Sequence, residues 1–333
     1  MCGIFGVIDH SSIDRKRFQN ALALLHHRGP DFADSKFWER AAFGFTRLAI
    51  QDLSPNGNQP MTLLDGSVTI VFNGEIYNHQ ILREKLKTEG AHFFSCSDTE
   101  VVLHAFHFWG WEKTLHSLEG MFGMAIYDHK NSDFYLARDR FGQKPLFFSQ
   151  DPKFGFIFAS ELKSIVSYVG SAAMEPRYCM NPLFTAGLSP RGKTCFKDIE
   201  QLESGEWLKY ELAVGKFIKK KYFQVEDLIS EDLYRELSEY SPKKMLETYE
   251  KVFDESVQLH LLSDAPLACL FSAGVDSSLI AALGARHTSL KLYHFESEQH
   301  DFRKIYQPFA EHFQLPLKVV KQKDADYIFH LPK

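Results

Sequence analysis

The spacing of apolar residues changes along this chain of 333 residues. The first two hundred residues hold short, β-rich runs separated by turn signals, and one such run ends at Asn73-Gly74, a pair typical of a tight turn. The last part of the chain instead alternates apolar strands with helical patterns, which is typical of a parallel sheet. We therefore expect an α+β domain over residues 1–205, a linker over 206–241 and an α/β domain over 242–333.

The bulk composition narrows the classes of function. The formal net charge is -5, whereas nucleic-acid binding usually requires a basic surface, so we expect no nucleic-acid partner. No apolar run approaches the roughly 18 residues of a membrane-spanning helix, so we expect no membrane partner. The 5 cysteines are scattered without a CxxC pair, which predicts neither a disulfide framework nor a metal site. These features favour a cytoplasmic protein.

The second residue of the chain is a cysteine that follows the initiating Met1. Removal of Met1 gives Cys2 a free α-amine, whose reference pKa is about 7.7–8.0, beside a thiol whose reference pKa is about 8.5. One residue then carries both a nucleophile and a base, as in enzymes whose chain-start amine activates a side chain. Most cysteines near a chain start have no such role, so Cys2 alone is a candidate nucleophile that the rest of the chain must support.

Further short motifs follow Cys2 in order along the first half of the chain. They are His27-Arg28-Gly29-Pro30-Asp31, Arg47-Leu48-Ala49-Ile50, Gln59-Pro60-Met61, Asn73-Gly74-Glu75-Ile76-Tyr77-Asn78, Ser97-Asp98-Thr99-Glu100, Arg138-Asp139-Arg140-Phe141-Gly142 and Ala159-Ser160-Glu161. Together these motifs resemble the class II glutamine amidotransferases with an N-terminal nucleophile, in the asparagine synthetase branch. The resemblance implies a four-layer α/β/β/α sandwich, followed by a partial α/β PP-loop domain of the ATP pyrophosphatase type.

The resemblance also implies a glutamine site. Arg47 matches the position that binds the α-carboxylate of glutamine, which suits a planar guanidinium. Asp98 and Glu75 match positions that bind the α-ammonium, whereas Asn73 (side-chain amide) and Gly74 (backbone N–H) match the oxyanion hole, whose donors stabilise the tetrahedral intermediate. Two apolar neighbours complete the implied site: Leu48 and Ile50.

Each of these residues also has a simpler interpretation when taken alone. Asn73-Gly74 is typical of a hairpin turn. Asp98, with the serine before it, is typical of a helix N-terminus. Arg47 would serve equally well in a surface ion pair. The functional interpretation is favoured because all of these residues, together with Cys2, occupy matching motif positions.

A second candidate site lies in the last part of the chain, where a serine- and glycine-containing loop joins an apolar strand to a helix. Small residues let backbone N–H groups approach a phosphate, and a helix N-terminus favours an anion. The loop resembles the PP-loop pattern Ser-Gly-Gly-x-Asp-Ser, except that Ala273 replaces the first glycine; its methyl group would weaken ATP binding if that position requires φ > 0. The implied ATP-binding residues are Leu270, Ser272, Ala273, Gly274, Val275, Asp276 and Ser277.

Only about 55 residues follow this loop in the sequence, and the further acidic motifs of the family are not among them. We therefore expect an incomplete, truncated synthetase domain. The resemblance nevertheless implies ATP with Mg²⁺ as the cofactor of the second part.

The leading functional hypothesis is a glutamine-dependent asparagine synthetase-like ligase. Glutamine is then hydrolysed to glutamate and ammonia, and the ammonia amidates aspartate through a β-aspartyl adenylate. The expected partners are glutamine, with ATP, aspartate and a second copy of the chain as further candidates. Two alternatives stay open: amidation of another carboxylate, and a glutaminase or glutamine-sensing remnant without synthetase activity.

Overall fold

The computed structural model describes residues 1–8, 12–179, 192–297 and 302–322 of the chain. It separates into two compact units, Met1–Ser230 and Glu231–Lys333. The end of the expected C-terminal domain, residues 323–333, lies outside the described residues.

The first unit contains two antiparallel sheets of six strands each, with strand orders β10-β8-β9-β1-β3-β2 and β12-β11-β7-β6-β5-β4. The strands of the first sheet are β1 (Gly3–Ile8), β2 (Phe32–Phe37), β3 (Ala41–Arg47), β8 (Phe147–Asp151), β9 (Gly155–Ala159) and β10 (Glu200–Gln201). Those of the second sheet are β4 (Met61–Thr62), β5 (Val68–Ile76), β6 (Gly120–Asp128), β7 (Asp133–Arg138), β11 (Glu206–Glu211) and β12 (Lys216–Lys221).

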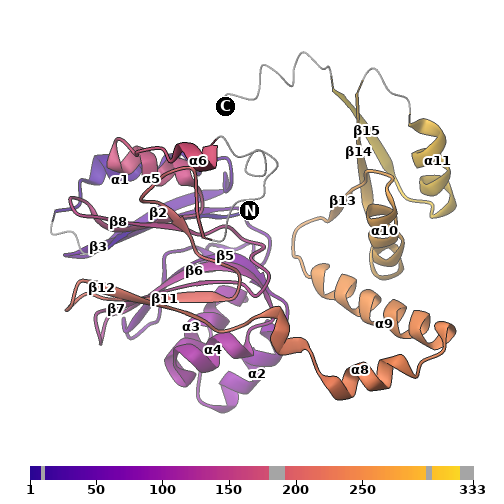
Figure 1. Ribbon diagram of the computed structural model, residues 1–333, viewed down its shortest axis with the longest axis horizontal. Helices are drawn as coiled ribbons and strands as arrows, with labels where there is room; N and C mark the ends of the chain where they lie inside the picture. Colours follow the sequence, from indigo (N-terminus) through magenta and orange to yellow (C-terminus); the bar gives the residue numbers. More distant parts are fainter. Residues whose placement is uncertain (9–11, 180–191, 298–301, 323–333) are drawn as a thin grey trace. The chain divides into compact units, whose positions relative to one another are not determined.

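Helices cover the outer face of each sheet. They are α1 (Arg15–Ala23) and α5 (Leu162–Val169) on the first sheet, and α2 (His79–Thr88), α3 (Asp98–Trp109) and α4 (Trp111–Ser117) on the second. Shorter elements are η1 (Pro55–Gly57), α6 (Pro176–Cys179) and η2 (Val225–Leu228). Between the sheets, one apolar cluster joins side chains from both inner faces, such as Phe43 and Phe134. The predicted four-layer α/β/β/α sandwich is therefore confirmed (Figure 1).

Helix α3 forms where the sequence predicted it, because its N-terminus carries strong local signals. The Ser97 side chain accepts a hydrogen bond from the backbone N–H of Thr99, and acidic residues occupy the first turn. Gly110 ends the helix with φ 75°, a conformation that glycine adopts at little cost. This helix start places Asp98 at a fixed position beside the end of β5.

Two expectations about local structure were wrong. Asn73 and Gly74 do not form a turn, because β5 continues through both of them to Ile76 and pairs with β6 throughout. The expected linker 206–241 starts too early: β11 and β12 occupy its first part and complete the second sheet, where β11 pairs with β7. β12 is the edge strand of this sheet, and four of its six residues are lysines, which suits an exposed edge.

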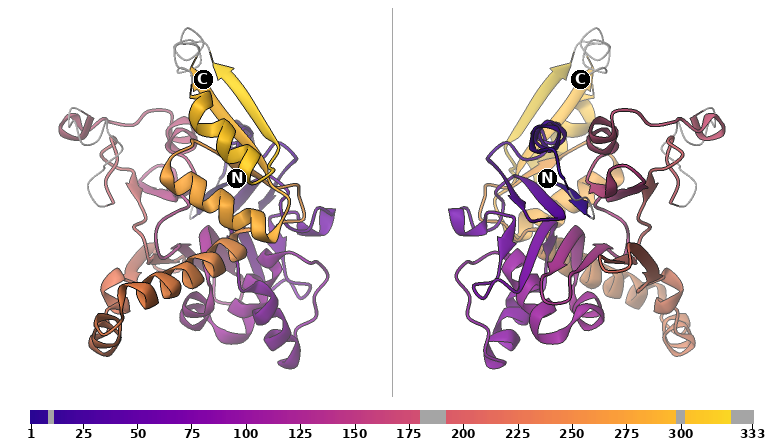
Figure 2. Two further views of the ribbon diagram at one scale, coloured as in Figure 1. Left: turned by 90° about the vertical axis from the view of Figure 1, so that its right-hand side faces the viewer. Right: turned by 90° about the vertical axis from the view of Figure 1, so that its left-hand side faces the viewer.

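The second unit is a small parallel α/β structure. Its elements are α8 (Glu231–Ser238), α9 (Pro242–His260), β13 (Ala268–Leu270), α10 (Val275–His287), β14 (Lys291–Ser297), α11 (Arg303–His312) and β15 (Leu317–Gln322). The sheet order is β13-β14-β15 and both pairings are parallel, as the alternating pattern predicted. Figure 2 shows α10 and α11 against this sheet, where Phe271, Leu292 and Tyr306 form the buried core.

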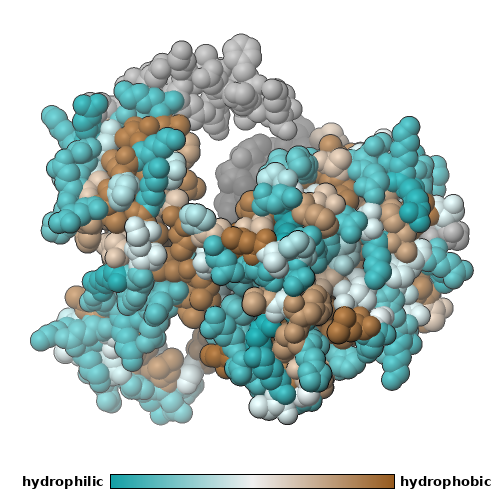
Figure 3. Space-filling view, turned by 180° about the vertical axis from the view of Figure 1, so that it is seen from behind, coloured by the Kyte–Doolittle hydropathy of each residue, from teal (hydrophilic) through white to brown (hydrophobic). Residues whose placement is uncertain are grey.

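The core of the second unit leaves apolar surface uncovered. Leu246 and Val252 on α9 and Leu270 at the end of β13 are exposed, and apolar side chains are visible on this unit in Figure 3. Among the described helices of the whole chain, none is long and apolar enough to cross a membrane.

Candidate active site

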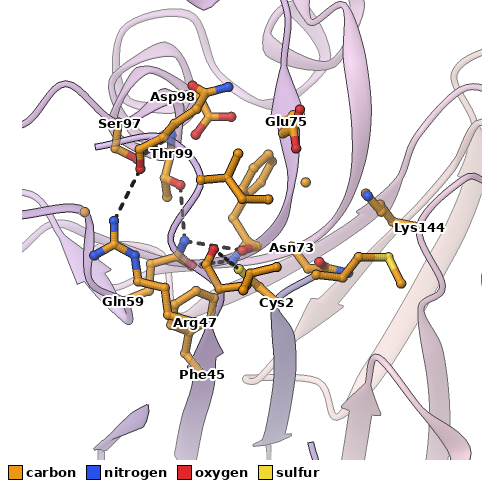
Figure 4. Close-up of a pocket in the computed structure, with 17 residues that line it drawn as sticks. Cys2, Phe45, Arg47, Gln59, Asn73, Glu75, Ser97, Asp98, Thr99 and Lys144 are labelled. Carbon is orange, nitrogen blue, oxygen red and sulfur yellow. Dashed lines mark hydrogen bonds between the residues drawn. The ribbon is translucent and has the colours of Figure 1, made fainter. Parts of the chain in front are cut away.

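A single pocket in the first unit contains all eight residues of the predicted glutamine site. It is lined from the residues before β1, from β3, β5, the segment after β3 and the start of α3. The eight residues are Cys2, Arg47, Leu48, Ile50, Asn73, Gly74, Glu75 and Asp98. Figure 4 shows Asp98 and Glu75 on one side of the pocket, across from Cys2, Arg47 and Asn73. The fold thus brings together residues that are far apart in the sequence, from Cys2 to Asp98. Their individual roles stay predictions.

Cys2 lies directly before β1 and is held from both sides. Its Sγ–H donates to the carbonyl of Leu48 at 3.6 Å, and Arg28 Nε donates to the Cys2 carbonyl at 2.9 Å. Arg28 is itself buried and paired with Glu161 at 2.8 Å. Burial raises the pKa of the Cys2 thiol, so the thiol is neutral while Met1 blocks the α-amine. Activation of Cys2 therefore requires a nearby base.

Asn73 contributes a buried, unpaired amide group to the wall of the pocket. The residue is 1% exposed, and its Nδ2 has no hydrogen-bond partner among the described residues. An unpaired buried donor costs about 1–3 kcal/mol, so its retention next to a candidate nucleophile is a sign of function. Gly74 follows in the same strand, where a Cβ atom would collide with the carbonyl of Met121 on β6. Only glycine therefore fits against β6 at that position.

Arg47 lies at the end of β3, with its guanidinium enclosed by the segment that follows. Nη1 donates to the Ser54 carbonyl (2.8 Å) and to Asn58 Oδ1 (2.7 Å), whereas Nη2 donates to the carbonyls of Gln51 (3.3 Å) and Asp52. These bonds fix the segment around the guanidinium. They also show that Arg47 is a buried residue of the pocket and not part of the surface ion pair considered above.

Gly57 allows this arrangement because a Cβ atom there would overlap the Arg47 guanidinium. We expect Gly57→Ala to displace Arg47 and to raise the KM for glutamine about tenfold or more, with a smaller effect on kcat, because substrate binding and not the reacting centre is disturbed. Steady-state kinetics of glutamate release measure both values. Gly66→Ala is the control for an added methyl group away from the pocket: Gly66 has open space around its Cα, so the strain of an alanine at φ 74° should lower stability and leave KM unchanged. An unchanged KM in Gly57→Ala would contradict this role of Arg47.

Asp98 is a buried carboxylate at the first position of α3. It accepts a hydrogen bond from the backbone N–H of Ile76 at 2.9 Å and is 5% exposed. Burial raises the pKa of Asp98 to about 6, although backbone hydrogen bonds oppose the shift. A carboxylate that is costly to ionise alone is well suited to gain from a cationic ligand such as an α-ammonium group.

The raised pKa of Asp98 predicts a pH dependence of glutamine binding. Below about pH 6, Asp98 becomes neutral, so Kd for glutamine should rise about tenfold per pH unit. Because the folded-state pKa exceeds the unfolded value, ionised Asp98 destabilises the fold above about pH 6. Asp98→Asn should therefore bind glutamine weakly at every pH while raising the free energy of unfolding at about pH 7.5 by up to about 3 kcal/mol. Calorimetry with Cys2→Ala measures binding, and chemical denaturation measures stability; a flat pH profile of Kd contradicts the assignment.

Three further residues of this site carry no role in the sequence-based prediction. Arg28 belongs to a quoted motif, but its bond to the Cys2 carbonyl is visible only in the fold. Lys144 follows a motif by two residues; it lines the pocket, and burial lowers the pKa of its ammonium group. Gln51 lines the same pocket next to Ile50. No local sequence signal marks Lys144 or Gln51 as a pocket residue.

The second candidate site forms the connection between β13 and α10 as predicted. Ser272 Oγ accepts from the Gly274 N–H at 3.3 Å and is hydrogen-bonded to Ser277 Oγ at 2.9 Å. The N-terminus of α10 has no side-chain cap, which leaves its first N–H groups for an anion. Leu270, Val275 and Asp276 are exposed around this loop. The loop therefore has the local geometry expected for a phosphate ligand.

Ala273 adopts φ 62°, the left-handed conformation that favours glycine. Position 273 therefore has the positive φ under which we expected the methyl group to weaken ATP binding. A non-glycine residue in this conformation costs about 1–2 kcal/mol. The methyl group packs against the apolar cluster of this unit, which contains Phe271 and Tyr306. Packing of the methyl group against this cluster thus offsets part of the conformational cost at Ala273.

No described group of three or more His, Cys, Asp and Glu residues is arranged to hold a metal ion. Within the described residues, the loop leaves backbone N–H groups open to an anion but offers no donor set for the Mg²⁺ that the resemblance implies.

Comparison with known proteins agrees with this geometry. The family model described as glutamine amidotransferase domain matches residues 1–223, and the model described as asparagine synthase matches residues 248–333. Glutamine-hydrolyzing asparagine synthetase 3 of Bacillus subtilis (strain 168) is 32% identical over 324 residues, which cover 93% of this chain and 50% of the relative. Glutamine-hydrolyzing asparagine synthetase 2 of Arabidopsis thaliana is 32% identical over 290 residues, covering 86% and 43%. The chain spans about half of the length of these relatives.

Two solved structures share the fold. Glutamine phosphoribosylpyrophosphate amidotransferase from B. subtilis, complexed with ADP and GMP, has a TM-score of 0.51 at 15% identity and covers 99% of this chain and 70% of its own. The structure described as the allosteric regulatory enzyme of purine biosynthesis has a TM-score of 0.52 at 16% identity, with 97% and 80% coverage. At these identities the likeness extends to the fold alone.

Proposed function

Because this chain belongs to the glutamine amidotransferase domain family, we propose that its first unit hydrolyses glutamine with Cys2 as the nucleophile. The observation that carries this proposal is the position of Cys2 in one pocket with the unpaired Nδ2 of Asn73. A nucleophile next to an unused, buried donor is the arrangement that acyl transfer requires.

In the proposed reaction, Met1 has been removed and the α-amine of Cys2 takes the thiol proton. The Sγ thiolate forms a bond to the side-chain carbonyl carbon of glutamine, and the carbonyl electrons move to oxygen. Asn73 Nδ2 and the Gly74 N–H donate to this oxyanion. The α-ammonium of Cys2 returns the proton to nitrogen, and ammonia leaves as the C–N bond breaks.

The second half of the proposed reaction releases glutamate. Water attacks the γ-glutamyl thioester on Cys2, and the α-amine accepts the proton of the water. The oxyanion forms again at the same donors, and the C–S bond breaks to free glutamate and the thiol. Asp98 and Arg47 hold the α-ammonium and α-carboxylate ends of the substrate throughout, which fixes its amide beside Sγ.

For the second unit we propose the ATP-binding part of an asparagine synthetase-like ligase. Its β13–α10 loop suits a phosphate, and the match to the asparagine synthase family supports aspartate as the acceptor. ATP would activate the aspartate side chain as a β-aspartyl adenylate, and ammonia from the first unit would displace AMP to give asparagine. We also propose that the residues of this loop bind ATP and that the chain forms a homo-oligomer.

One incubation separates these activities. The purified chain receives glutamine, with and without ATP, Mg²⁺ and aspartate, while glutamate, asparagine and AMP are measured. Glutamate release supports the role of the first unit, and asparagine with AMP supports the role of the second. Glutamate without asparagine limits the activity to the first unit; ATP-dependent AMP release with a different carboxylate identifies another acceptor. Glutamine binding without glutamate release contradicts the proposed hydrolysis and favours a glutamine sensor.

A further inference from the structure

Lys144 places an ammonium group in the candidate glutamine pocket without a bonding partner. The residue is 8% exposed, and Figure 4 shows its nitrogen directed into the pocket. In the part of the chain that the structure describes, no hydrogen bond or ion pair reaches Nζ. Unlike the side-chain atoms of Gln51, Nζ is not sealed from solvent. A buried cation without a bonded counter-ion is costly, so its retention beside a candidate nucleophile points to a role in the reaction.

The turn between β7 and β8 fixes the backbone that carries Lys144. The fully buried Asp139 carboxylate accepts from the backbone N–H groups of Gln143 at 2.9 Å and Lys144 at 3.0 Å. The Lys144 carbonyl accepts from Arg138 Nε at 2.7 Å. Both polar groups of the Lys144 backbone are therefore engaged, so the side chain starts from a fixed point in the wall of the pocket.

Among the described residues, two cationic side chains line this pocket, and they differ in their bonds. The guanidinium of Arg47 makes four hydrogen bonds to its own segment, whereas Nζ of Lys144 makes none. Asp98 and Glu75 bring two carboxyl groups to the same pocket. Burial and the charge of Asp98 raise the pKa of the Cys2 thiol. A thiolate at Cys2 thus needs a nearby positive charge, and Lys144 is available to supply it.

The ammonium group of Lys144 keeps its charge at neutral pH. Burial lowers its pKa, whereas the charge of Glu75 opposes this shift. Lysine starts from a reference pKa of about 10.4, which leaves the group protonated at neutral pH. Because a negative Cys2 raises the pKa of Lys144, a charged Lys144 must in turn favour the Cys2 thiolate. The charges that act on Lys144 come from four segments: Glu75 on β5, Arg28 after α1, Asp139 after β7 and Cys2 before β1.

We propose that the Lys144 ammonium supports Cys2 as a fixed positive charge, which favours the Sγ thiolate and disfavours protonation of the α-amine. Lys144 itself forms and breaks no bond. In the chain that retains Met1, burial and the charges of Arg28 and Lys144 lower the pKa of the terminal amine. The same influences apply to the amine that removal of Met1 exposes one residue further along. The charge thus extends the activity of Cys2 to lower pH. This inference rests on the proposed function of the first unit.

The test follows the reactivity of Cys2 as a function of pH, in the form of the chain that begins at Cys2. Iodoacetamide alkylates the thiolate, and mass spectrometry of the first peptide measures the rate at Sγ. We expect Lys144→Met to raise the pH midpoint of alkylation by about one unit, because a nearby opposite charge is lost. Below the midpoint, the rate at a given pH should then fall about tenfold. Lys144→Arg keeps the charge and should keep the midpoint of the parent.

Glutamine hydrolysis provides a second readout of the same charge. In Lys144→Met, the acidic limb of the pH profile of kcat/KM should move to higher pH by about one unit, because the pKa values of both the thiol and the α-amine rise. The loss of activity should therefore be smaller at about pH 9 than at about pH 7. Lys16→Met is the control: Lys16 is exposed on α1, so neither profile should change.

Thermal unfolding separates this role from a structural one. Lys144→Met removes a buried charge that has no bonding partner, so its melting temperature should equal or exceed that of the parent. A residue that mattered for packing alone would lower the melting temperature and leave both pH profiles in place. If Lys144→Met does not fold, Lys144→Gln replaces it in every measurement.

The outcomes separate this inference from the proposed function. If the alkylation midpoint of Lys144→Met equals that of the parent, the inference is wrong, and glutamate release by the parent still supports the proposed function. An equal shift in Lys144→Arg also overturns the inference, because the charge is then not the cause. If the parent releases no glutamate, the proposed function fails, whereas the alkylation midpoints still decide whether Lys144 acts on Cys2.

Discussion

Cys2→Ala is expected to abolish glutamine hydrolysis, with a loss of at least about 10³-fold in kcat, because it removes the only atom proposed to bond to the substrate carbon. Glutamine binding should persist, since Asp98, Arg47 and Asn73 stay in place. Glutamate release measured by a coupled assay gives kcat, and calorimetry gives Kd.

The control for Cys2→Ala is Cys96→Ala, which removes an exposed thiol from the same unit. The backbone N–H of Cys96 donates to Asp52, and its side chain does not line the pocket. The Cys96→Ala variant should therefore be as active as the parent protein. Full activity in Cys2→Ala would exclude nucleophilic catalysis by this residue and would leave the pocket without its proposed chemistry.

Asn73→Ala is expected to lower kcat for glutamine about 10²–10³-fold with little change in KM, because the lost donor acts mainly on the oxyanion. The unpaired state of Nδ2 in the free pocket supports this expectation, since no structural bond is lost with it. Asn73→Asp should be at least as damaging, because it places a negative charge where the oxyanion develops.

Stopped assays over a range of glutamine concentrations separate kcat from KM for these variants. Asn20→Ala, an exposed asparagine on α1, serves as the control for the loss of an amide. If Asn73→Ala raised KM and left kcat unchanged, Asn73 would be a binding residue for the ground state, and the proposed oxyanion hole would be wrong.

The sequence was sufficient to predict the layers of the fold because strands and helices in this chain carry strong local signals. The Ser97 cap located the start of α3, and alternation of strands and helices located the parallel sheet β13-β14-β15. Local signals also misled at Asn73-Gly74. A pair that favours turns in isolation continues β5 because β6 provides a paired neighbour along the whole strand.

The composition of the candidate pocket was predicted from motifs, whereas its geometry could not be. The structure shows that Arg47 is enclosed by its own segment and that Gln51 is left unsatisfied; both facts depend on how residues 51–58 turn back towards β3. Lys144 enters the pocket from the segment between β7 and β8. Such contacts arise from tertiary packing, for which a short motif holds no signal. The left-handed conformation of Ala273 likewise became visible only in the backbone of the structure.

If Cys2 acts as an N-terminal nucleophile, hydrolysis requires its free α-amine, and the most direct measurement compares two forms of the same chain. In one, mass spectrometry establishes that Cys2 is the first residue; in the other, Met1 is retained. Burial raises the pKa of the Cys2 thiol, and in the form with Met1 the Cys2 nitrogen is an amide, which cannot accept the thiol proton. We expect glutamine to yield glutamate only with the form that begins at Cys2. Equal glutamate release by both forms, or none by the form that begins at Cys2, would contradict it.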